Sequence, residues 1–540
     1  MEKFNIPLRF IAKNASSVMV LMCCSTLFFS CKKDPSDPPV ETQVEVRKEK
    51  IMSNLDSLYA YAQQIYLWNS ELPAGKDFKP ARFYDGGAGN EIDIYKNEIF
   101  ALSRFAINPS NNKPFEYNAN AAGIPKYSSL IETGSAGTVP RYNSDDNGFG
   151  LAFVGTSDGI RILYVDMNAP AWQAGLRRGQ KVVSINNEKA VASTGYYSYI
   201  SSALNGSNLS IVTETLENNL PVNRTIQLKK QYFVPSPVLK SAVLNVENKK
   251  IGYIAYKSFT DEENTRQFLG PVLNQFAVNG ISELIVDLRY NTGGYQNTCR
   301  YLANCIAPQS ADGKMMFTEY YNSQMQAGKA DLLANQPILG FDNKPVYING
   351  KIATLHDIDY SPAANRNNFE IEGNALHLEK VSFIVSSQTA SASELLINVL
   401  KPYLKVQLVG VSADGSGNVS TYGKPVGFFD IKIDRYKVYL AMYQTRNANG
   451  EGDFFDGLPA GISTMDDVTV DFADIADPAV KAIVSPTTKS SGSAIKKLGT
   501  VKQVPAGGTV ESPKIKKYIG LSSTGEGLIK AYSDFKLKRN

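Results

Sequence analysis

Ser391 is the residue of this 540-residue chain best placed to act as a nucleophile. It lies in the segment TASASE (residues 389–394), between an apolar run at 381–386 and a helical run at 394–400. A serine hydroxyl is a weak nucleophile near neutral pH, so it needs a base, an oxyanion stabiliser and a fixed position. A strand-to-helix turn helps with the oxyanion, because the free N–H groups at a helix start can hold negative charge.

The same segment has a simpler interpretation. Ser391 and Glu394 have the three-residue spacing of a capping box, in which the two side chains satisfy the first N–H groups of a helix. On spacing alone, a structural cap is favoured over a nucleophile. Further residues are needed to separate the two hypotheses.

Two other segments carry residue types that suit the same chemistry. Residues 291–294 (NTGG) follow an apolar strand at 284–288, and glycine lets a backbone approach a substrate carbonyl closely. Lys424 stands in TYGK (421–424), and the residues around it could desolvate its amine: Tyr422, Pro425, Val426, Phe428 and Phe429. Taken singly, the first segment is also typical of a helix-entry turn and the second of a lysine at a strand end.

The elements around these segments predict an α/β arrangement. From about residue 234, strands at 251–256 and 284–288 alternate with helices at 261–276 and 297–306. Residues 310–376 are polar and are expected to form an irregular insertion over the site. Earlier in the chain, apolar spacings of three and four predict helices over 46–70 and 93–105.

The region between these two parts has short strands with glycine punctuation. The loop Gly148-Phe149-Gly150-Leu151 is followed by APAWQAGL (169–176), and together they strongly resemble a PDZ domain. The resemblance implies that the N–H groups of this loop receive a peptide carboxylate. It also implies that the peptide adds as a strand beside the loop.

Three segments then follow in the order found in one peptidase family. LIVDLRYNTGG (284–294), TASASE and TYGKPVG (421–427) resemble the motifs of the S41 peptidases, the C-terminal-processing or tail-specific family. The resemblance implies an α/β catalytic domain of crotonase-like or ClpP-like fold, with Ser391 as nucleophile and Lys424 as general base. It also implies an oxyanion hole made by the N–H of Gly293 or Gly294 with that of Ala392.

The base is the less secure part of this assignment. A lysine amine must lose about three units from its usual pKa of ~10.4, roughly 4 kcal/mol, before it can accept a proton near neutral pH. The family's shorter serine-to-lysine spacing would place Ser416 at the base position, so Lys424 requires an insertion at 413–420. Phe428 stands where the family has a glutamine. His356 and His377 are expected at the surface and not as an alternative base.

Two functions therefore remain open. The first is an envelope serine endopeptidase that cleaves extended or C-terminal regions of polypeptides through an acyl-enzyme. The alternative is a catalytically inactive S41-like lipoprotein that binds peptides through its PDZ domain as an adaptor. No cofactor or metal is expected, because the chain has no CxxC or His/Cys cluster. Cys299 and Cys305 are predicted to be buried thiols that do not face each other well.

The start of the chain resembles a bacterial lipoprotein signal. Three basic residues precede a short apolar run at 17–29, which ends in LFFSC (27–31). The resemblance implies cleavage before Cys31, its acylation, and a lipid anchor in the cell envelope. The outer membrane is the expected site, on either the periplasmic or the external face. An ordinary secretory signal with an incidental cysteine is the alternative.

The charge balance and the segment order complete the predictions. Lys+Arg 56 against Asp+Glu 52 argues against a nucleic-acid partner and leaves polypeptides as the expected substrates.

The predicted boundaries are a signal peptide at 1–30, a tether at 31–45, a helical N-terminal domain at 46–142, a PDZ domain at 143–233, a peptidase domain at 234–484, and a linker with a C-terminal segment at 485–540.

Overall fold

The computed structural model describes most of the chain. The described residues are 40–119, 121–133, 146–217, 220–340, 344–371, 376–485, 513–519, 528–529, 536 and 538. The predicted signal peptide and Cys31 therefore lie outside the described residues. The chain divides into two compact units, Met1–Glu49 and Lys50–Asn540.

Helix α1 (Val40–Ile65) is the first element. It begins within the segment 31–45 that the sequence predicted to be a tether, and it ends five residues before the predicted helix end. No helix in the described parts of the chain is long and apolar enough to cross a bilayer.

The helical N-terminal region of the second unit does not have a core of its own. After α1 come α2 (Gly75–Phe78) and α3 (Glu91–Leu102), and α3 confirms the second predicted helix. Leu55 and Ile99 belong to the same buried cluster as Phe383 of the α/β domain. Strand β3 (Ser129–Glu132) pairs with β23 (Tyr436–Tyr439), so this region is joined to the α/β domain by packing and by a sheet.

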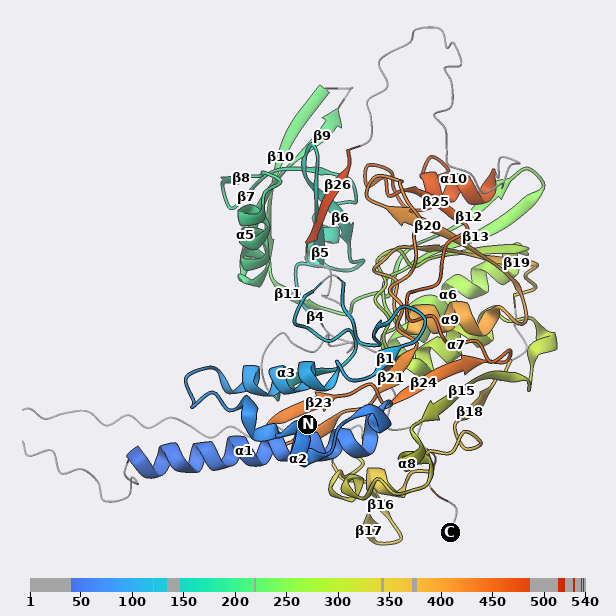
Figure 1. The fold of residues 1–540 in the computed structure, drawn as a ribbon. Helices are drawn as coiled ribbons and strands as arrows, with labels where there is room; N and C mark the ends of the chain where they lie inside the picture. Colours follow the sequence, from blue (N-terminus) through green and yellow to red (C-terminus); the bar gives the residue numbers. More distant parts are fainter. Residues whose placement is uncertain are drawn as a thin grey trace, which may run out of the picture. The chain divides into compact units, whose positions relative to one another are not determined.

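A six-stranded sheet forms the centre of the α/β domain. Its order is β12-β13-β14-β19-β20-β25, antiparallel between β12 and β13 and parallel elsewhere. The strands are β12 (Val238–Val246), β13 (Lys249–Tyr256), β14 (Glu283–Asp287), β19 (Lys380–Val385), β20 (Lys405–Ser412) and β25 (Ile462–Met465). Helices α6 (Glu262–Asn279), α7 (Gln296–Ile306), α9 (Ala392–Leu400) and α10 (Pro478–Val484) accompany it (Figure 1). The predicted alternation of strands and helices is confirmed.

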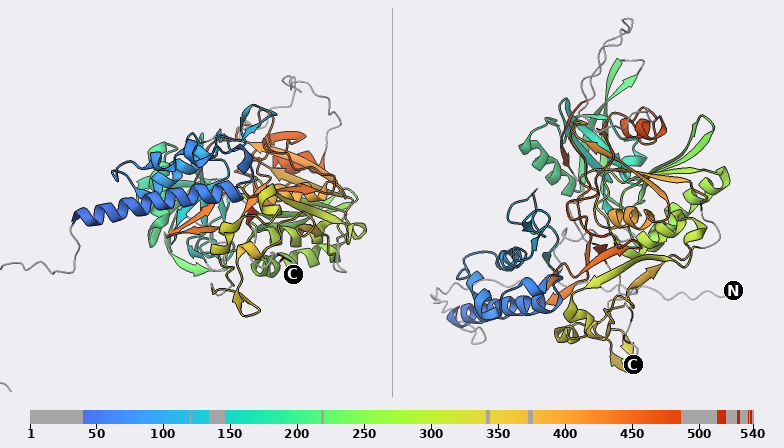
Figure 2. Two further views of the ribbon diagram at one scale, coloured as in Figure 1. Left: turned by 60° about the horizontal axis from the view of Figure 1, so that its bottom comes forward. Right: turned by 45° about the vertical axis from the view of Figure 1, so that its right-hand side comes forward.

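The segment predicted to be an irregular insertion contributes two strands, β15 and β18, to a second sheet. The order of this sheet is β18-β15-β24-β21-β27. The strands are β18 (Arg366–Asn368), β15 (Met315–Tyr321), β24 (Tyr443–Asn447), β21 (Val426–Phe428) and β27 (Leu528–Ile529). Phe317 in β15 is fully buried, so the prediction of irregular structure over 310–376 was wrong for this strand. Elsewhere in the segment, the hairpin β16 (Tyr347–Ile348) and β17 (Lys351–Ile352) projects from the domain (Figure 2).

The region predicted to be a PDZ domain forms a seven-stranded sheet. Its path is β10-β9-β7-β6-β5-β26, with β8 paired to β7. The strands are β5 (Leu151–Thr156), β6 (Gly159–Val165), β7 (Lys181–Ile185), β8 (Glu188–Lys189), β9 (Asn208–Glu217), β10 (Leu220–Lys229) and β26 (Ile515–Ile519). Helices α4 (Pro170–Gln173) and α5 (Thr194–Asn205) belong to this region, and β4 (Asp146–Gly148) pairs with β11 (Gln231–Phe233) at its ends. Strand β26 comes from the segment 485–540, where no such role was predicted.

Candidate active site

Ser391 lies at the junction between β19 and α9. Strands β14 and β19 are parallel neighbours, so the loops at their carboxyl ends, which carry the NTGG segment and Ser391, meet at one edge of the sheet. Ser391 has φ 61° and ψ −116°, a conformation that costs a non-glycine residue about 1–3 kcal/mol. Such strained strand-to-helix turns are used to expose nucleophilic serines.

The hydroxyl of Ser391 is buried at the start of α9. Ser391 is 2% exposed, and Oγ makes no hydrogen bond of standard geometry with the described residues. Ser391 and Glu394 have the arrangement of the expected capping box, in which Ser391 Oγ faces the Glu394 N–H, but the hydrogen bond that is well formed is the one from the Ser391 N–H to Glu394 Oε2 at 2.9 Å. A strained backbone that holds an unbonded, buried hydroxyl at a helix start is better explained by a reactive group than by a cap.

The NTGG loop packs directly against Ser391. The N–H of Ala390 and the hydroxyl of Ser393 each donate to the carbonyl oxygen of Asn291, at 3.2 Å. Gly293 has φ 111°, and a Cβ added to it would lie 2.7 Å from Ser391 Cβ and 3.0 Å from Oγ. Glycine at 293 is therefore required both by the backbone conformation and by the approach of the serine.

The predicted oxyanion donors differ in their availability. The N–H of Gly293 donates to Asn291 Oδ1 at 2.9 Å, so it is already used in this conformation. Within the described part of the chain, the N–H groups of Gly294 and Ala392 make no hydrogen bond. Of the two predicted glycines, Gly294 is therefore the one whose N–H is not already engaged within the described part of the chain.

Glu394 connects the nucleophile to the predicted base, a role that the sequence analysis missed. Its buried carboxylate accepts the Ser391 N–H on Oε2, the Gly423 N–H on Oε1 at 2.7 Å and the Lys424 N–H on Oε2 at 2.8 Å. The hydroxyl of Thr421 donates to the same carboxylate. Burial raises the pKa of Glu394, and these donors oppose that rise. The spacing Ser391-x-x-Glu394 was visible in the sequence, but its second set of partners comes from residues 27 to 30 positions away.

Lys424 reaches the site from the second sheet. It precedes β21 and is 1% exposed, and its Nζ lies 5.4 Å from the ring centroid of Phe428. Ser416, the residue at the rival base position, is exposed, and its hydroxyl donates to Asp414. Lys424, and not Ser416, is therefore the residue whose backbone N–H shares the Glu394 carboxylate with the N–H of Ser391.

A late loop at 455–459 supports the TYGK segment. Leu458 N–H donates to Thr421 Oγ at 2.7 Å, and Thr421 N–H donates to Leu458 O at 3.1 Å. Gly423 has φ 86°, and a Cβ there would lie 2.3 Å from Phe455 O. These contacts, together with those of Glu394, fix the backbone immediately before Lys424.

A buried ionic cluster holds the other end of the NTGG loop. Arg289 is 1% exposed and pairs with Asp287 (2.8 Å), Asp466 (2.9 Å) and Asp477 (3.0 Å). Burial alone would raise the pKa of Asp466, but Arg289 and Arg178 hold it below its ordinary value. Asp287, Arg289 and Asn291 therefore hold the loop in place through their side chains.

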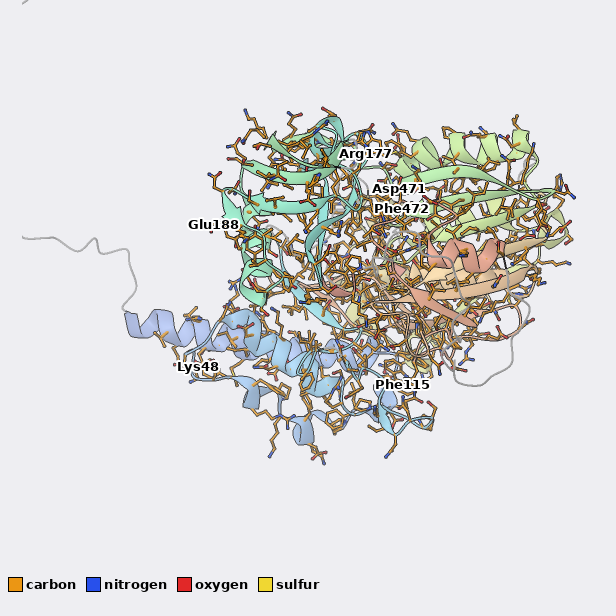
Figure 3. All side chains as sticks on the ribbon, turned by 90° about the horizontal axis from the view of Figure 1, so that it is seen from above. Lys48, Phe115, Arg177, Glu188, Asp471 and Phe472 are labelled. Atoms are coloured by element: carbon orange, nitrogen blue, oxygen red, sulfur yellow. The ribbon has the colours of Figure 1, made fainter. Side chains whose placement is uncertain are left out.

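The cluster also reaches the PDZ-like region. Arg178, which follows α4, lies 3.3 Å from Asp466 and donates to the hydroxyl of Tyr290 at 3.0 Å. Its guanidinium lies over the ring of Phe472, which is labelled in Figure 3, 4.4 Å from the ring centroid. Arg178 thus connects the PDZ-like region to Tyr290, the residue directly before the NTGG loop.

The predicted peptide-binding loop lies at the start of β5. Its members are Gly148, Phe149, Gly150 and Leu151. The Phe149 carbonyl accepts the Ala171 N–H, and the Gly150 carbonyl accepts the Asp166 N–H at 2.9 Å. Gly150 has φ 69°, and a Cβ there would lie 2.1 Å from Ala169 Cβ. These carbonyl contacts hold the loop on the start of α4.

The remaining predicted residues lie elsewhere. His377 is exposed, and His356 is half-buried with Nδ1 3.3 Å from Ala330 O. Cys299 is buried, and its Sγ donates to the carbonyl oxygen of Ala392 at 3.3 Å; no disulfide joins it to the half-buried Cys305. Among the described residues, no group of three or more His, Cys, Asp or Glu side chains could hold a metal.

Two segments of the chain match known protein families. The sequence model of peptidase family S41 matches residues 250–450, and a PDZ domain model matches residues 161–215. The carboxy-terminal processing protease CtpB of Bacillus subtilis is 27% identical over 145 residues. That match spans 27% of this chain and 29% of the length of CtpB.

One solved structure shares the fold. A Bacteroides fragilis NCTC 9343 protein assigned to the S41 proteases superposes with a TM-score of 0.51 at 20% identity, covering 79% of this chain and 95% of that one. Together with the two sequence-model matches, it confirms the fold class, with a PDZ domain and an α/β S41 domain. The photosystem II D1 C-terminal processing protease gives a TM-score of 0.42 at 15% identity, covering 81% of this chain and 98% of that one.

Proposed function

Residues 250–450 of this chain are a peptidase family S41 domain and residues 161–215 lie in a PDZ domain, and from this premise we propose that the chain is a serine endopeptidase. Ser391 is the nucleophile and Lys424 the general base. The observation that carries the proposal is the strained, buried and unbonded Ser391 hydroxyl at the start of α9. Glu394 supports it, because one carboxylate holds both the serine turn and the lysine segment.

The proposed reaction gives each of these groups one role. Ser391 Oγ attacks the scissile carbonyl carbon, and Lys424 Nζ takes the hydroxyl proton. The oxyanion receives hydrogen bonds from the N–H groups of Gly294 and Ala392. Lys424 returns the proton to the leaving amine, and water then hydrolyses the acyl-enzyme with Lys424 again as base.

Substrate binding must complete this arrangement. Ser391 Oγ is not hydrogen-bonded to Lys424 or to any other described residue before substrate binds. Catalytic hydrogen bonds are often long in the absence of substrate and tighten in the reacting complex. The N–H of Gly293 becomes a third oxyanion donor if Asn291 Oδ1 releases it.

Polypeptides are the proposed substrates. Strand β5 of the PDZ sheet, which pairs with β26 in this structure, can accept an extended chain in the place of β26, with main-chain hydrogen bonds that do not depend on sequence. A Ser-Lys site that acts on such chains would cleave extended or C-terminal regions. Acylation of Cys31 would tether the enzyme in the bacterial envelope, as proposed from the sequence. Metabolic labelling with a fatty acid, lost in Cys31→Ser, tests that anchor.

Covalent labelling tests the chemistry directly. A fluorophosphonate probe should add to the full chain once, at Ser391, as read by intact mass and peptide mapping. Labelling should disappear in Ser391→Ala and fall at least a hundredfold in Lys424→Met. The exposed residues Ser416 and Lys405 provide matched controls, and Ser416→Ala and Lys405→Met should label like the parent.

Two results would refute the assignment. Labelling that persists in Ser391→Ala would place the nucleophile elsewhere, and labelling unchanged in Lys424→Met would remove Lys424 as base. A parent chain that never reacts with the probe, yet binds peptides, would instead favour the inactive adaptor.

A further inference from the structure

The last part of the chain occupies the edge of the PDZ sheet. Strand β26 pairs antiparallel with β5, with Ile519 opposite Phe153 and Tyr518 opposite Val154. Figure 1 shows the red β26 beside the green β5 in this sheet. β26 also contacts α5, so it lies between the edge strand and the helix. PDZ domains bind their peptides as an added strand on such an edge.

The direction of β26 is that of a peptide that approaches the GFGL loop. Its first residue, Ile515, lies opposite Thr156, and its last, Ile519, lies opposite Phe153, near the loop at 148–151. The chain continues beyond Ile519, so the site holds an internal segment in place of a terminal carboxylate. β26 therefore supplies the strand contacts of a ligand without its charged end.

Some side chains of β26 are buried against the PDZ domain and others face the solvent, as in a peptide bound as an added strand. Ile519 is 4% exposed and lies in the PDZ core with Phe149 and Leu151. Lys516 and Lys517 are exposed. Ile515, at the other end of the strand, is also buried. Buried apolar side chains separated by solvent-facing ones are the pattern by which added strands gain specificity.

β26 also contacts the peptidase domain. The hydroxyl of Tyr518 donates to Asp466 Oδ2 at 3.0 Å, and its ring lies 5.7 Å from that of Tyr290. Ile515 N–H donates to Ala413 O at 3.4 Å. Tyr290 directly precedes the NTGG loop, so the occupant of the PDZ edge touches the cluster that holds this loop.

Later residues of the same tail run along the peptidase domain. The backbone of β27 pairs in parallel with β21, Gly427 opposite Leu528 and Phe428 opposite Ile529. Farther on, Lys538 N–H donates to Asp357 O at 2.8 Å, and Asp359 N–H donates to Lys536 O. The tail is thus held at several points, one of them on the strand that follows Lys424.

We propose that residues 515–519 are an internal ligand of this chain's own PDZ domain, which an external polypeptide must displace before it binds there. The inference rests on the proposed peptide-binding role of that domain. The tether makes displacement demanding, because a tethered segment acts at an effective concentration of about a millimolar. If the tethered segment itself has an intrinsic dissociation constant of ~100 μM, this competition weakens the apparent binding of an external peptide about tenfold.

Peptide binding to the full chain tests the proposal. A fluorescein-labelled peptide PKIKKYI, the sequence of residues 513–519, is titrated by anisotropy against Ser391→Ala protein, so that cleavage cannot interfere. Adding Ile519→Asp places a charge in the PDZ core and should release β26, so the peptide should bind about tenfold more tightly. The matched variant Lys516→Asp changes an exposed residue of the same strand and should bind like the parent.

Hydrogen exchange gives an independent readout. In Ile519→Asp, the amides of 151–156 that face β26 should lose protection, while those of β6 and β7 keep it as evidence that the domain is folded. Equal peptide affinity in all three proteins, or unchanged protection of 151–156, would overturn the internal ligand while leaving the peptide-binding proposal intact. Peptide binding to none of them would overturn both, and the probe reaction at Ser391 would remain a separate test of the peptidase.

Discussion

Replacing Glu394 by glutamine tests whether one carboxylate positions both halves of the site. The side chain keeps its size but loses its charge and one of its two acceptor oxygens. In the parent, Oε2 accepts the N–H groups of Ser391 and Lys424, while Oε1 accepts the Gly423 N–H and the Thr421 hydroxyl. An amide can satisfy only one of these pairs fully.

The expected cost follows from the least damaging arrangement. The amide oxygen faces Ser391 and Lys424, the amide NH₂ donates to the rotatable Thr421 hydroxyl, and the Gly423 N–H is left without an acceptor. An orphaned buried donor costs about 1–3 kcal/mol, and the two retained bonds lose their charge assistance, roughly another 1 kcal/mol in total. If the 2–4 kcal/mol sum is felt in the transition state, the rate falls about 30- to 1000-fold.

The assay is the second-order rate of fluorophosphonate labelling at Ser391, paired with PKIKKYI binding in the Ile519→Asp background. Glu394→Gln should slow labelling and leave peptide binding unchanged, because Glu394 positions the site without touching the PDZ domain. Glu98→Gln is the matched control, since Glu98 is also a buried glutamate but lies on α3. A labelling rate within threefold of the parent would refute the positioning role.

Three further outcomes are expected. Burial raises the pKa of Glu98 from 4.5 to about 9, and neither carboxyl oxygen has a hydrogen-bond partner among the described residues. Because the acid pKa is raised in the folded state, the contribution of Glu98 to the free energy of unfolding is complete below pH 4.5 and is lost progressively up to pH 9. Between pH 5 and pH 8 the parent should therefore lose about 4 kcal/mol of unfolding free energy through this group, and Glu98→Gln should not show that loss in urea unfolding. Ser391→Gly should be about 1 kcal/mol more stable than Ser391→Ala in the same assay, because glycine adopts φ 61° without strain; equal stability would contradict the strain. Gly293→Ala should abolish probe labelling, since its Cβ would lie 2.7 Å from Ser391 Cβ, whereas Gly270→Ala, with nothing within 4 Å, should label normally.

The local patterns that the sequence encodes were reliable near the site. The apolar strand at 284–288, the glycine loop and the serine turn were predicted because each depends on neighbours within a few residues. The same reasoning failed for β15, whose mixed sequence MMFTEYY is a strand because β24 and β18 pair with it. Pairing of that kind is not encoded within the segment.

The sequence by itself determined which residues could react: a serine at a strand-to-helix turn, a lysine among apolar neighbours, and glycines that allow close approach. Only the tertiary structure decided how they are used. It gave Ser391 its strained backbone, made Glu394 a support for both Ser391 and Lys424, and engaged the Gly293 N–H with Asn291. It also placed β26 on the PDZ sheet, more than 350 residues along the chain from its partner strand. These outcomes depend on contacts between distant segments, whose free energies emerge only when the whole chain is packed.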